Sequence, residues 1–129
     1  MTLSSKAMRG HGDDVARELN ARFGKSRAVA NEPLGALTTY RVGGNASVFV
    51  VAESKDDLFE LAAVVGELGL PVAVIGRGSN LLVADTGFPG VAVQLGPAFD
   101  VTEMLADDEV RIAGAASLPV VARQLTAAG

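Results

Sequence analysis

The chain of 129 residues contains no cysteine, no tryptophan and a single histidine, and each shortage excludes a class of site. Without cysteine there are no disulfides, thiolate nucleophiles or cysteine-ligated metals. His11 alone argues against a histidine-based metal site, so we expect no metal. No apolar run approaches the roughly 20 residues of a membrane span, and residues 1–8 lack the apolar stretch of a signal peptide. We therefore expect a cytoplasmic protein without a membrane segment.

Charge of positive sign is also scarce. The formal net charge of −4 argues against a nucleic-acid partner, because binding phosphates requires a basic surface. Residues 1–30 hold six of the 11 basic residues and three of the 15 acidic ones. This basic segment is either a binding arm or, the interpretation we favour, the solvated face of one short helix. Hydrophobic residues make up 49% of the chain, which indicates one folded domain.

The N-terminal quarter is expected to contain little structure. We expect disorder over residues 1–11, a short helix that begins at Asp13 and ends at Gly24, and a loop over residues 31–45. The apolar face of the helix, spaced at i, i+4 and i+8, comprises Val15, Leu19 and Phe23.

A strand–helix–strand unit follows. Residues Ser47–Ala52 read as a strand because β-branched and aromatic residues fit a pleated surface. Ser54 is a good N-cap for a helix over residues 54–68, which a glycine then ends. The uniformly apolar residues Val72–Ile75 predict a strand that is buried on both faces.

Further strands are expected at Leu81–Val83 and Val91–Leu95, a hairpin within residues 99–113, and a last helix over 118–128. The predicted fold class is therefore α/β (α+β). Its mixed sheet contains a βαβ unit, and the helices at 54–68 and 118–128 cover that sheet.

The most informative feature is a small polar loop between two apolar segments, made of Gly76, Arg77, Gly78, Ser79 and Asn80. Glycine has no Cβ and serine is small, so several backbone N–H groups can converge on one spot. Such a concave site suits a phosphate or pyrophosphate and indicates a nucleotide-type cofactor. On spacing alone an ordinary connecting loop is an equal alternative, because these are common turn residues. The flanking apolar strands favour a docking site.

Two familiar phosphate loops do not fit. The dinucleotide fingerprint requires a third glycine where this chain has Leu81. Gly24, Lys25 and Ser26 match the end of a Walker loop, but the glycine required five positions earlier is replaced by Leu19.

Several other polar residues are candidates for a site or for a structural role. Tyr40 could pack near a cofactor and Arg41 could meet a phosphate; the alternatives are a half-buried core aromatic and, favoured for Arg41, a loop-anchoring ion pair. Asp56, Asp57 and Glu60 read as a solvated helix face with capping value.

Two segments then resemble a known family: residues 38–46, Thr-Thr-Tyr-Arg-Val-Gly-Gly-Asn-Ala, and residues 70–83, Leu-Pro-Val-Ala-Val-Ile-Gly-Arg-Gly-Ser-Asn-Leu-Leu-Val. With residues 87–91 and 112–116 they are similar to the start of the UDP-N-acetylenolpyruvoylglucosamine reductases, flavoenzymes that complete UDP-N-acetylmuramate for peptidoglycan. The resemblance covers residues 33–129. The loop itself is shared more loosely with flavin oxidoreductases of the vanillyl-alcohol oxidase and p-cresol methylhydroxylase fold.

The resemblance implies FAD as cofactor, with its pyrophosphate held mainly by backbone N–H groups. It also implies that NADPH reduces the FAD by hydride transfer, and that hydride then passes to the enolpyruvyl double bond of a UDP-sugar substrate. In the family the proton-donating serine and the assisting arginine and glutamate lie beyond the end of this chain, so we assign no catalytic residue. The implied cofactor-binding residues are Gly76, Arg77, Gly78, Ser79, Asn80, Leu81 and Gly114.

We divide the chain into residues 1–30, a tail with a short helix, and residues 31–129, an FAD-binding domain incomplete at its C-terminus. The resemblance implies roles in cell-wall biogenesis, cell shape and cell division, and predicts that these 129 residues alone are inactive. Two alternatives stay open. One is another FAD-dependent oxidoreductase of the same fold, and the other is a non-catalytic truncated nucleotide-binding module.

Overall fold

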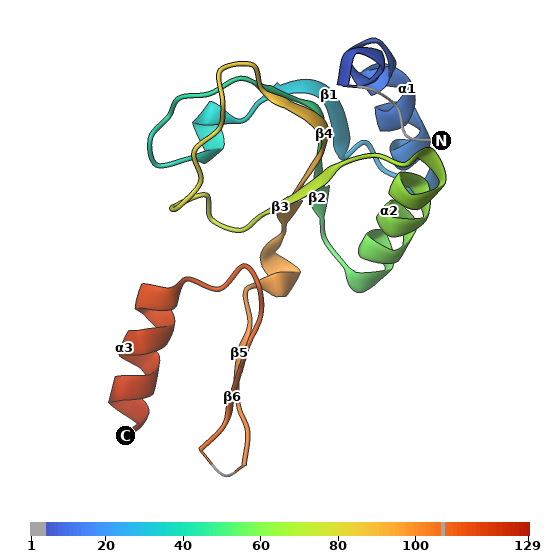
Figure 1. The fold of residues 1–129 in the computed structure, drawn as a ribbon. Helices are drawn as coiled ribbons and strands as arrows, with labels where there is room; N and C mark the ends of the chain where they lie inside the picture. The colour runs from blue at the N-terminus through green and yellow to red at the C-terminus, as the bar shows by residue number, and fades with distance from the viewer. Residues whose placement is uncertain (1–4, 107) are drawn as a thin grey trace.

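A computed structural model describes residues 5–106 and 108–129 of the chain. Figure 1 shows a sheet with two helices on one side of it, joined to a hairpin and a third helix that lie apart from it. The elements are α1 (Ser5–Phe23), β1 (Ala28–Pro33), η1 (Gly35–Leu37), β2 (Asn45–Ala52), α2 (Lys55–Leu68), β3 (Val72–Ile75), β4 (Phe88–Leu95), η2 (Pro97–Phe99), β5 (Thr102–Met104), β6 (Val110–Ile112) and α3 (Leu118–Ala128).

The main sheet has four strands in the order β1-β2-β4-β3. Strand β1 runs antiparallel to β2, whereas β2 and β3 both run parallel to β4. The predicted mixed sheet and its βαβ unit, β2-α2-β3, are thus confirmed. Strand β4 lies between the two strands of that unit. The carboxyl ends of the three parallel strands β2, β4 and β3 therefore lie at the same end of the sheet.

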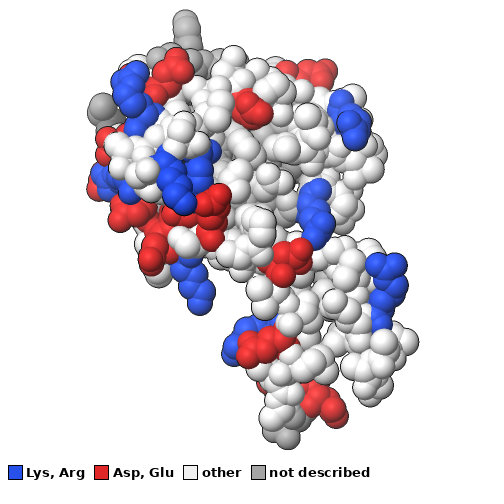
Figure 2. Space-filling view, turned by 180° about the vertical axis from the view of Figure 1, so that it is seen from behind, with Lys and Arg blue, Asp and Glu red and all other residues white. Residues whose placement is uncertain are grey.

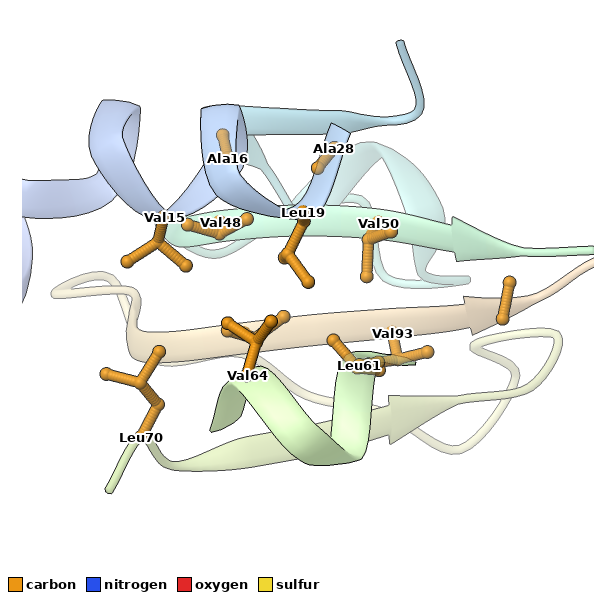
Figure 3. Close-up of a cluster of buried hydrophobic side chains, with 12 residues drawn as sticks. Val15, Ala16, Leu19, Ala28, Val48, Val50, Leu61, Val64, Leu70 and Val93 are labelled. Atoms are coloured by element: carbon orange, nitrogen blue, oxygen red, sulfur yellow. The ribbon is translucent and has the colours of Figure 1, made fainter. Parts of the chain in front are cut away.

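Helices α1 and α2 pack on the same face of this sheet (Figure 3). The predicted apolar face of α1 is confirmed, because Val15 and Leu19 are buried and Phe23 packs against the same cluster. Aliphatic side chains supply nearly all of this core, as the scarcity of aromatic residues predicts. Its fully buried members are Leu19, Val48, Val50, Val64, Val91 and Val93.

Helix α1 is longer than predicted: it begins at Ser5, not at Asp13. Ala, Met, Lys and Arg among residues 5–12 are strong helix formers, and they outweigh the two glycines there. Residues 1–4 of the expected disordered stretch lie outside the described residues. The expected boundary at residue 30 falls inside β1, so the helix and the sheet share one core.

The basic residues of α1 lie among acidic partners. Figure 2 shows the two charges interspersed over the α1 and α2 side of the molecule. Arg22 makes ion pairs with Glu18 at 2.9 Å and with Glu67 of α2 at 3.1 Å. These pairs favour a solvated helix face over a binding arm.

Helix α2 has both predicted ends. Ser54 accepts a hydrogen bond from the Asp57 N–H in a capping box, and Gly69 closes the helix in the left-handed conformation. The expectation that Asp57 is solvated is wrong, because the residue is 8% exposed and its carboxylate accepts two hydrogen bonds from Arg27. Arg27, with the backbone N–H groups of Glu53 and Ser54, lowers the pKa of this carboxyl to about 2.

Strand β3 is not buried as predicted: Val72 is 42% and Val74 66% exposed. The strand lies at the sheet edge, and the buried side chains of α2 pack over β2 and β4 instead (Figure 3). The predicted strand Leu81–Val83 is also wrong, because this extended segment joins no sheet. Burial alternates along this segment, because Leu81 and Val83 pack on the second face of the sheet.

We call residues 5–96 the sheet unit and residues 97–129 the hairpin unit. The predicted hairpin is confirmed, since β5 and β6 pair antiparallel. Helix α3 has the predicted bounds, but it lies beside the hairpin and does not cover the main sheet (Figure 1). Within residues 5–106 and 108–129, no helix combines the length and the apolar character needed to cross a membrane.

Candidate functional site

The polar loop lies at the edge of the sheet where its parallel strands end. Gly76 follows the last residue of β3, and Leu95 and Gly96 end the neighbouring β4. In open α/β sheets, ligands bind outside the carboxyl ends of parallel strands. The predicted loop therefore lies where this architecture places a ligand.

Gly78 is the residue that fits this loop to the rest of the sheet unit. Its φ of +67° is left-handed, and a Cβ there would overlap the carbonyl oxygen of Leu37. The Gly78 carbonyl accepts a hydrogen bond from the Thr39 N–H at 3.4 Å. Only glycine allows two backbone segments to approach in this way.

The segment that receives Gly78 is held by a buried hydroxyl. Thr38 is 5% exposed; its Oγ1 donates to the Gly35 carbonyl at 2.9 Å and accepts from the Arg41 N–H at 3.1 Å. The resemblance singled out residues 38–46, but the support that Leu37 and Thr38 give to Gly78 was missed. No local sequence signal identifies it, because the contact joins residues that are distant in the chain.

The tip of the loop carries unused hydrogen-bond donors. Among the described residues, the backbone N–H groups of Gly78, Ser79 and Asn80 donate no hydrogen bond. The side chains of Ser79 and Asn80 also make none there, and both residues are exposed. Successive N–H groups without partners form the kind of concave site that binds an anion.

The loop meets the other predicted glycine across the two units. A Cβ on Gly76 would lie 3.4 Å from the carbonyl oxygen of Gly114, and one on Gly114 would lie 2.8 Å from Leu95 Cδ1. A cavity of about 430 Å³ opens at this junction, lined by Gly76, Arg77, the end of β4, Asp100 and Ala115. The structure thus brings together Gly76 and Gly114, which are far apart in sequence.

The remaining predicted residues differ in their surroundings. Leu81 packs against the core of the second sheet face. The Arg77 side chain donates through Nε to the Ala115 carbonyl at 3.1 Å and through Nη2 to Asp100 Oδ2 at 2.9 Å.

Tyr40 and Arg41 extend from the loop that supports Gly78. Tyr40 is 63% exposed, which does not fit a half-buried core aromatic. Arg41 is exposed with a left-handed φ of 53°, and within the described part of the chain it makes no ion pair. The expected anchoring pair is therefore absent from the described residues.

A larger cavity, of about 640 Å³, opens at the opposite ends of the strands. Asp13 and Asp85 are among its lining residues, together with Asn31 and Asn45, and no lysine or arginine is. Such a wall repels phosphate groups. The smaller junction cavity beside the polar loop is the better candidate for a nucleotide-type ligand.

The geometry of the loop residues fits a dinucleotide cofactor. Unpaired N–H groups at Gly78, Ser79 and Asn80 match the acceptor oxygens of a pyrophosphate. Gly76 and Gly114 let the loop, the turn and Leu95 approach one another closely, because Cβ atoms at these positions would meet the Gly114 carbonyl oxygen and Leu95 Cδ1.

Comparison with known proteins agrees with this fit. The chain is 38% identical to the UDP-N-acetylenolpyruvoylglucosamine reductase of Bacillus subtilis (strain 168), over 91% of this chain and 38% of that protein. It is 43% identical to the reductase of the same name from Rhodopseudomonas palustris (strain HaA2), over 81% of this chain and 34% of that protein.

A solved structure gives the same result. The crystal structure of UDP-N-acetylenolpyruvylglucosamine reductase from Thermus caldophilus has a TM-score of 0.60 and 27% identity, covering 79% of this chain and 33% of that one. The chain thus spans about a third of the length of these relatives. The family model described as FAD binding domain matches residues 46–129, more than half of the chain, and the chain therefore belongs to this family of FAD binding domains.

Proposed function

We propose that the polar loop binds the pyrophosphate of FAD. The single observation that carries the proposal is the row of N–H groups without partners at Gly78, Ser79 and Asn80, held at the carboxyl end of β3. The proposed cofactor-binding residues are Gly76, Arg77, Gly78, Ser79, Asn80, Leu81 and Gly114. Arg77 contributes its backbone N–H, and Leu81 anchors the loop on the sheet.

The protein that contains this chain is proposed to be a UDP-N-acetylenolpyruvoylglucosamine reductase. When bound, FAD supplies a ring that accepts hydride from a nicotinamide and passes it on. The proposed donor is NADPH, and the proposed acceptor is the enolpyruvyl group of a UDP-sugar. Support comes from relatives of that name at 38% and 43% identity.

Within this activity the described residues bind and orient the cofactor; none is assigned to proton transfer. The proposed setting is peptidoglycan synthesis, and with it cell division, in the cytoplasm. We propose that residues 31–129 form the cofactor-binding part of the enzyme. In this proposal, other segments of the full-length protein bind the substrate and carry out its reduction.

The cofactor proposal is tested by titrating the flavin-free full-length protein with FAD and following flavin fluorescence. In Ser79→Glu we expect affinity to fall by about tenfold or more, because the new carboxylate faces the pyrophosphate across the exposed loop. Ser79→Gln is the matched control, since it adds similar bulk without charge. Equal affinity in the two variants would contradict the loop assignment.

A second pair of variants tests the close approach at Gly78. Gly78→Ala should lower FAD affinity because its Cβ displaces the loop from Leu37. Gly66→Ala is the control: it lies in α2, nothing would contact its Cβ within 4 Å, and helix propensity favours the change.

The activity is tested by NADPH oxidation in the presence of UDP-N-acetylglucosamine enolpyruvate. We expect oxidation that depends on both FAD and this substrate. A protein that binds FAD but consumes oxygen without NADPH would refute the reductase and leave the cofactor site intact.

A further inference from the structure

The side chain of Arg77 connects the two units of the molecule. It starts in the polar loop of the sheet unit, and both of its hydrogen bonds end in the hairpin unit, on Asp100 and on the Ala115 carbonyl. Among the described residues, two side-chain hydrogen bonds join the units, and this guanidinium donates both of them. Its loss would leave the junction to main-chain connection and apolar contact.

The rest of the junction leaves the angle between the units weakly determined. The main chain passes through Gly96 into η2, and Phe99 packs against the core of the sheet unit. The turn that carries Gly114 is bound to this connecting segment by one hydrogen bond, which the Ala115 N–H donates to the Phe99 carbonyl at 2.9 Å. Among the described residues, no strand of the main sheet pairs with the hairpin, so no ladder fixes the turn against the loop there.

The chemistry of arginine suits such a connection. A guanidinium is a planar fork whose Nε and Nη donors can satisfy two acceptors at once, whereas a lysine ammonium is a compact point charge. Here one donor holds the connector at Asp100 and the other holds the turn at Ala115, which is 8% exposed. Both contacts line the junction cavity of about 430 Å³.

We propose that Arg77 is a positioning residue, which fixes the Gly114 turn against the polar loop and so sets the width of the junction cavity, which we call the flavin groove. Its guanidinium acts through Asp100 and Ala115 and is not itself a ligand of the pyrophosphate. The inference rests on the proposed FAD function and deepens it. It opposes the simpler assumption that an arginine in a phosphate loop neutralises the phosphate directly.

The two roles predict opposite effects at Asp100. If the guanidinium bound phosphate, Asp100→Ala would free its charge, and FAD affinity would stay equal or rise. For a positioning role, Asp100→Ala and Arg77→Met should each weaken FAD binding by about threefold to tenfold, as expected for a half-exposed ion pair with one added hydrogen bond. The double variant should be no weaker than Arg77→Met alone, because both changes remove the same connection.

A conservative variant separates the roles a second time. Arg77→Lys keeps the charge and would preserve most of a direct phosphate interaction, but it cannot hold two acceptors from two segments. We expect it to behave like Arg77→Met. The matched control is Arg111→Met, which removes an ion pair with Glu103 of similar exposure, at 2.8 Å, within the hairpin. It should leave FAD affinity unchanged.

A measurement without flavin keeps this inference distinct from the cofactor proposal. Residues 1–129 contain no cysteine, so spin labels can be attached at Phe59→Cys in α2, which is 72% exposed, and Gln124→Cys, exposed on α3. In the full-length protein, freed of any other cysteine, we expect a narrow distance distribution. It should broaden in Arg77→Met and in Asp100→Ala but not in Arg111→Met.

The outcomes are distinguishable. Unchanged distances in Arg77→Met, or FAD affinity retained in Arg77→Lys and Asp100→Ala, would overturn the positioning role. Broadened distances in a protein whose parent does not bind FAD would refute the cofactor proposal, and with it the effect on the groove, while leaving the mechanical connection in place. Broadened distances together with weakened FAD binding support the proposal.

Discussion

A single residue affects the stability of the fold most where its charge is buried, and Asp57 is the clearest case. Its carboxylate accepts hydrogen bonds from Arg27 and from the backbone N–H groups of Glu53 and Ser54. The folded-state pKa of about 2 lies below the ordinary value of 3.8, so folding favours the charged form. The stability that this provides is complete above about pH 4 and is lost as the pH falls toward 2.

We therefore predict that Asp57→Asn lowers the free energy of unfolding at pH 7 by about 2 kcal/mol. It should also flatten the decline of stability between pH 4 and pH 2. Urea unfolding at a series of pH values measures both effects. Asp56→Asn is the control, because Asp56 lies in the same helical turn but is exposed. Equal losses in the two variants would contradict the role of the buried pair.

The sequence predicted Asp57 only in part, for a physical reason. The spacing from Ser54 identified a capping position, because capping is local. The ion pair with Arg27 was not predictable, since it joins the segment between α1 and β1 to the first turn of α2, which only the tertiary fold brings together. Gly78 shows the same limit: its small size suggested a ligand loop, but its contact with Leu37 depends on the tertiary fold.

At the scale of elements, capping residues predicted α2 closely, and the apolar pattern predicted α3 and the β5–β6 hairpin. The predicted burial of strand β3 was wrong, because a run of apolar residues does not reveal whether its strand lies at the centre or the edge of a sheet. In register, Val74 of β3 lies beside Val93 of β4. Val74 is 66% exposed and Val93 is 0% exposed, although the two residues are identical in type.

This pair yields a prediction about the edge. Val93→Ala should lower the free energy of unfolding by about 2 kcal/mol, because it leaves a cavity between α2 and the sheet. Val74→Ala should change it by less than about 0.5 kcal/mol. Chemical denaturation of the two variants under identical conditions measures the difference. A loss in Val74→Ala as large as in Val93→Ala would mean that another part of the full-length protein covers the edge in solution.

At the scale of the whole molecule, the two units differ in how much apolar surface they bury. The sheet unit holds nearly all the buried residues, whereas the hairpin unit leaves its apolar side chains largely in solvent. A two-stranded hairpin alone is marginally stable in water. Helix α3 buries one residue, Val121. The exposed large hydrophobic residues of the hairpin unit are Val101, Met104, Ile112, Leu118 and Val120.

We predict that amide hydrogen exchange in residues 1–129 is fast across β5, β6 and α3 and slow in β2 and β4. Added FAD should slow exchange at residues 76–81 and at the turn of residues 113–116, because a ligand that binds only the folded loop and turn stabilises them by mass action. Residues 104 and 110, at the outer ends of β5 and β6, provide the internal control, since they do not line the cavity and should not respond. Exchange that slows uniformly over the hairpin unit would instead indicate that FAD folds this unit as a whole. Exchange that is unchanged at both the loop and the turn would contradict a shared flavin groove between the units.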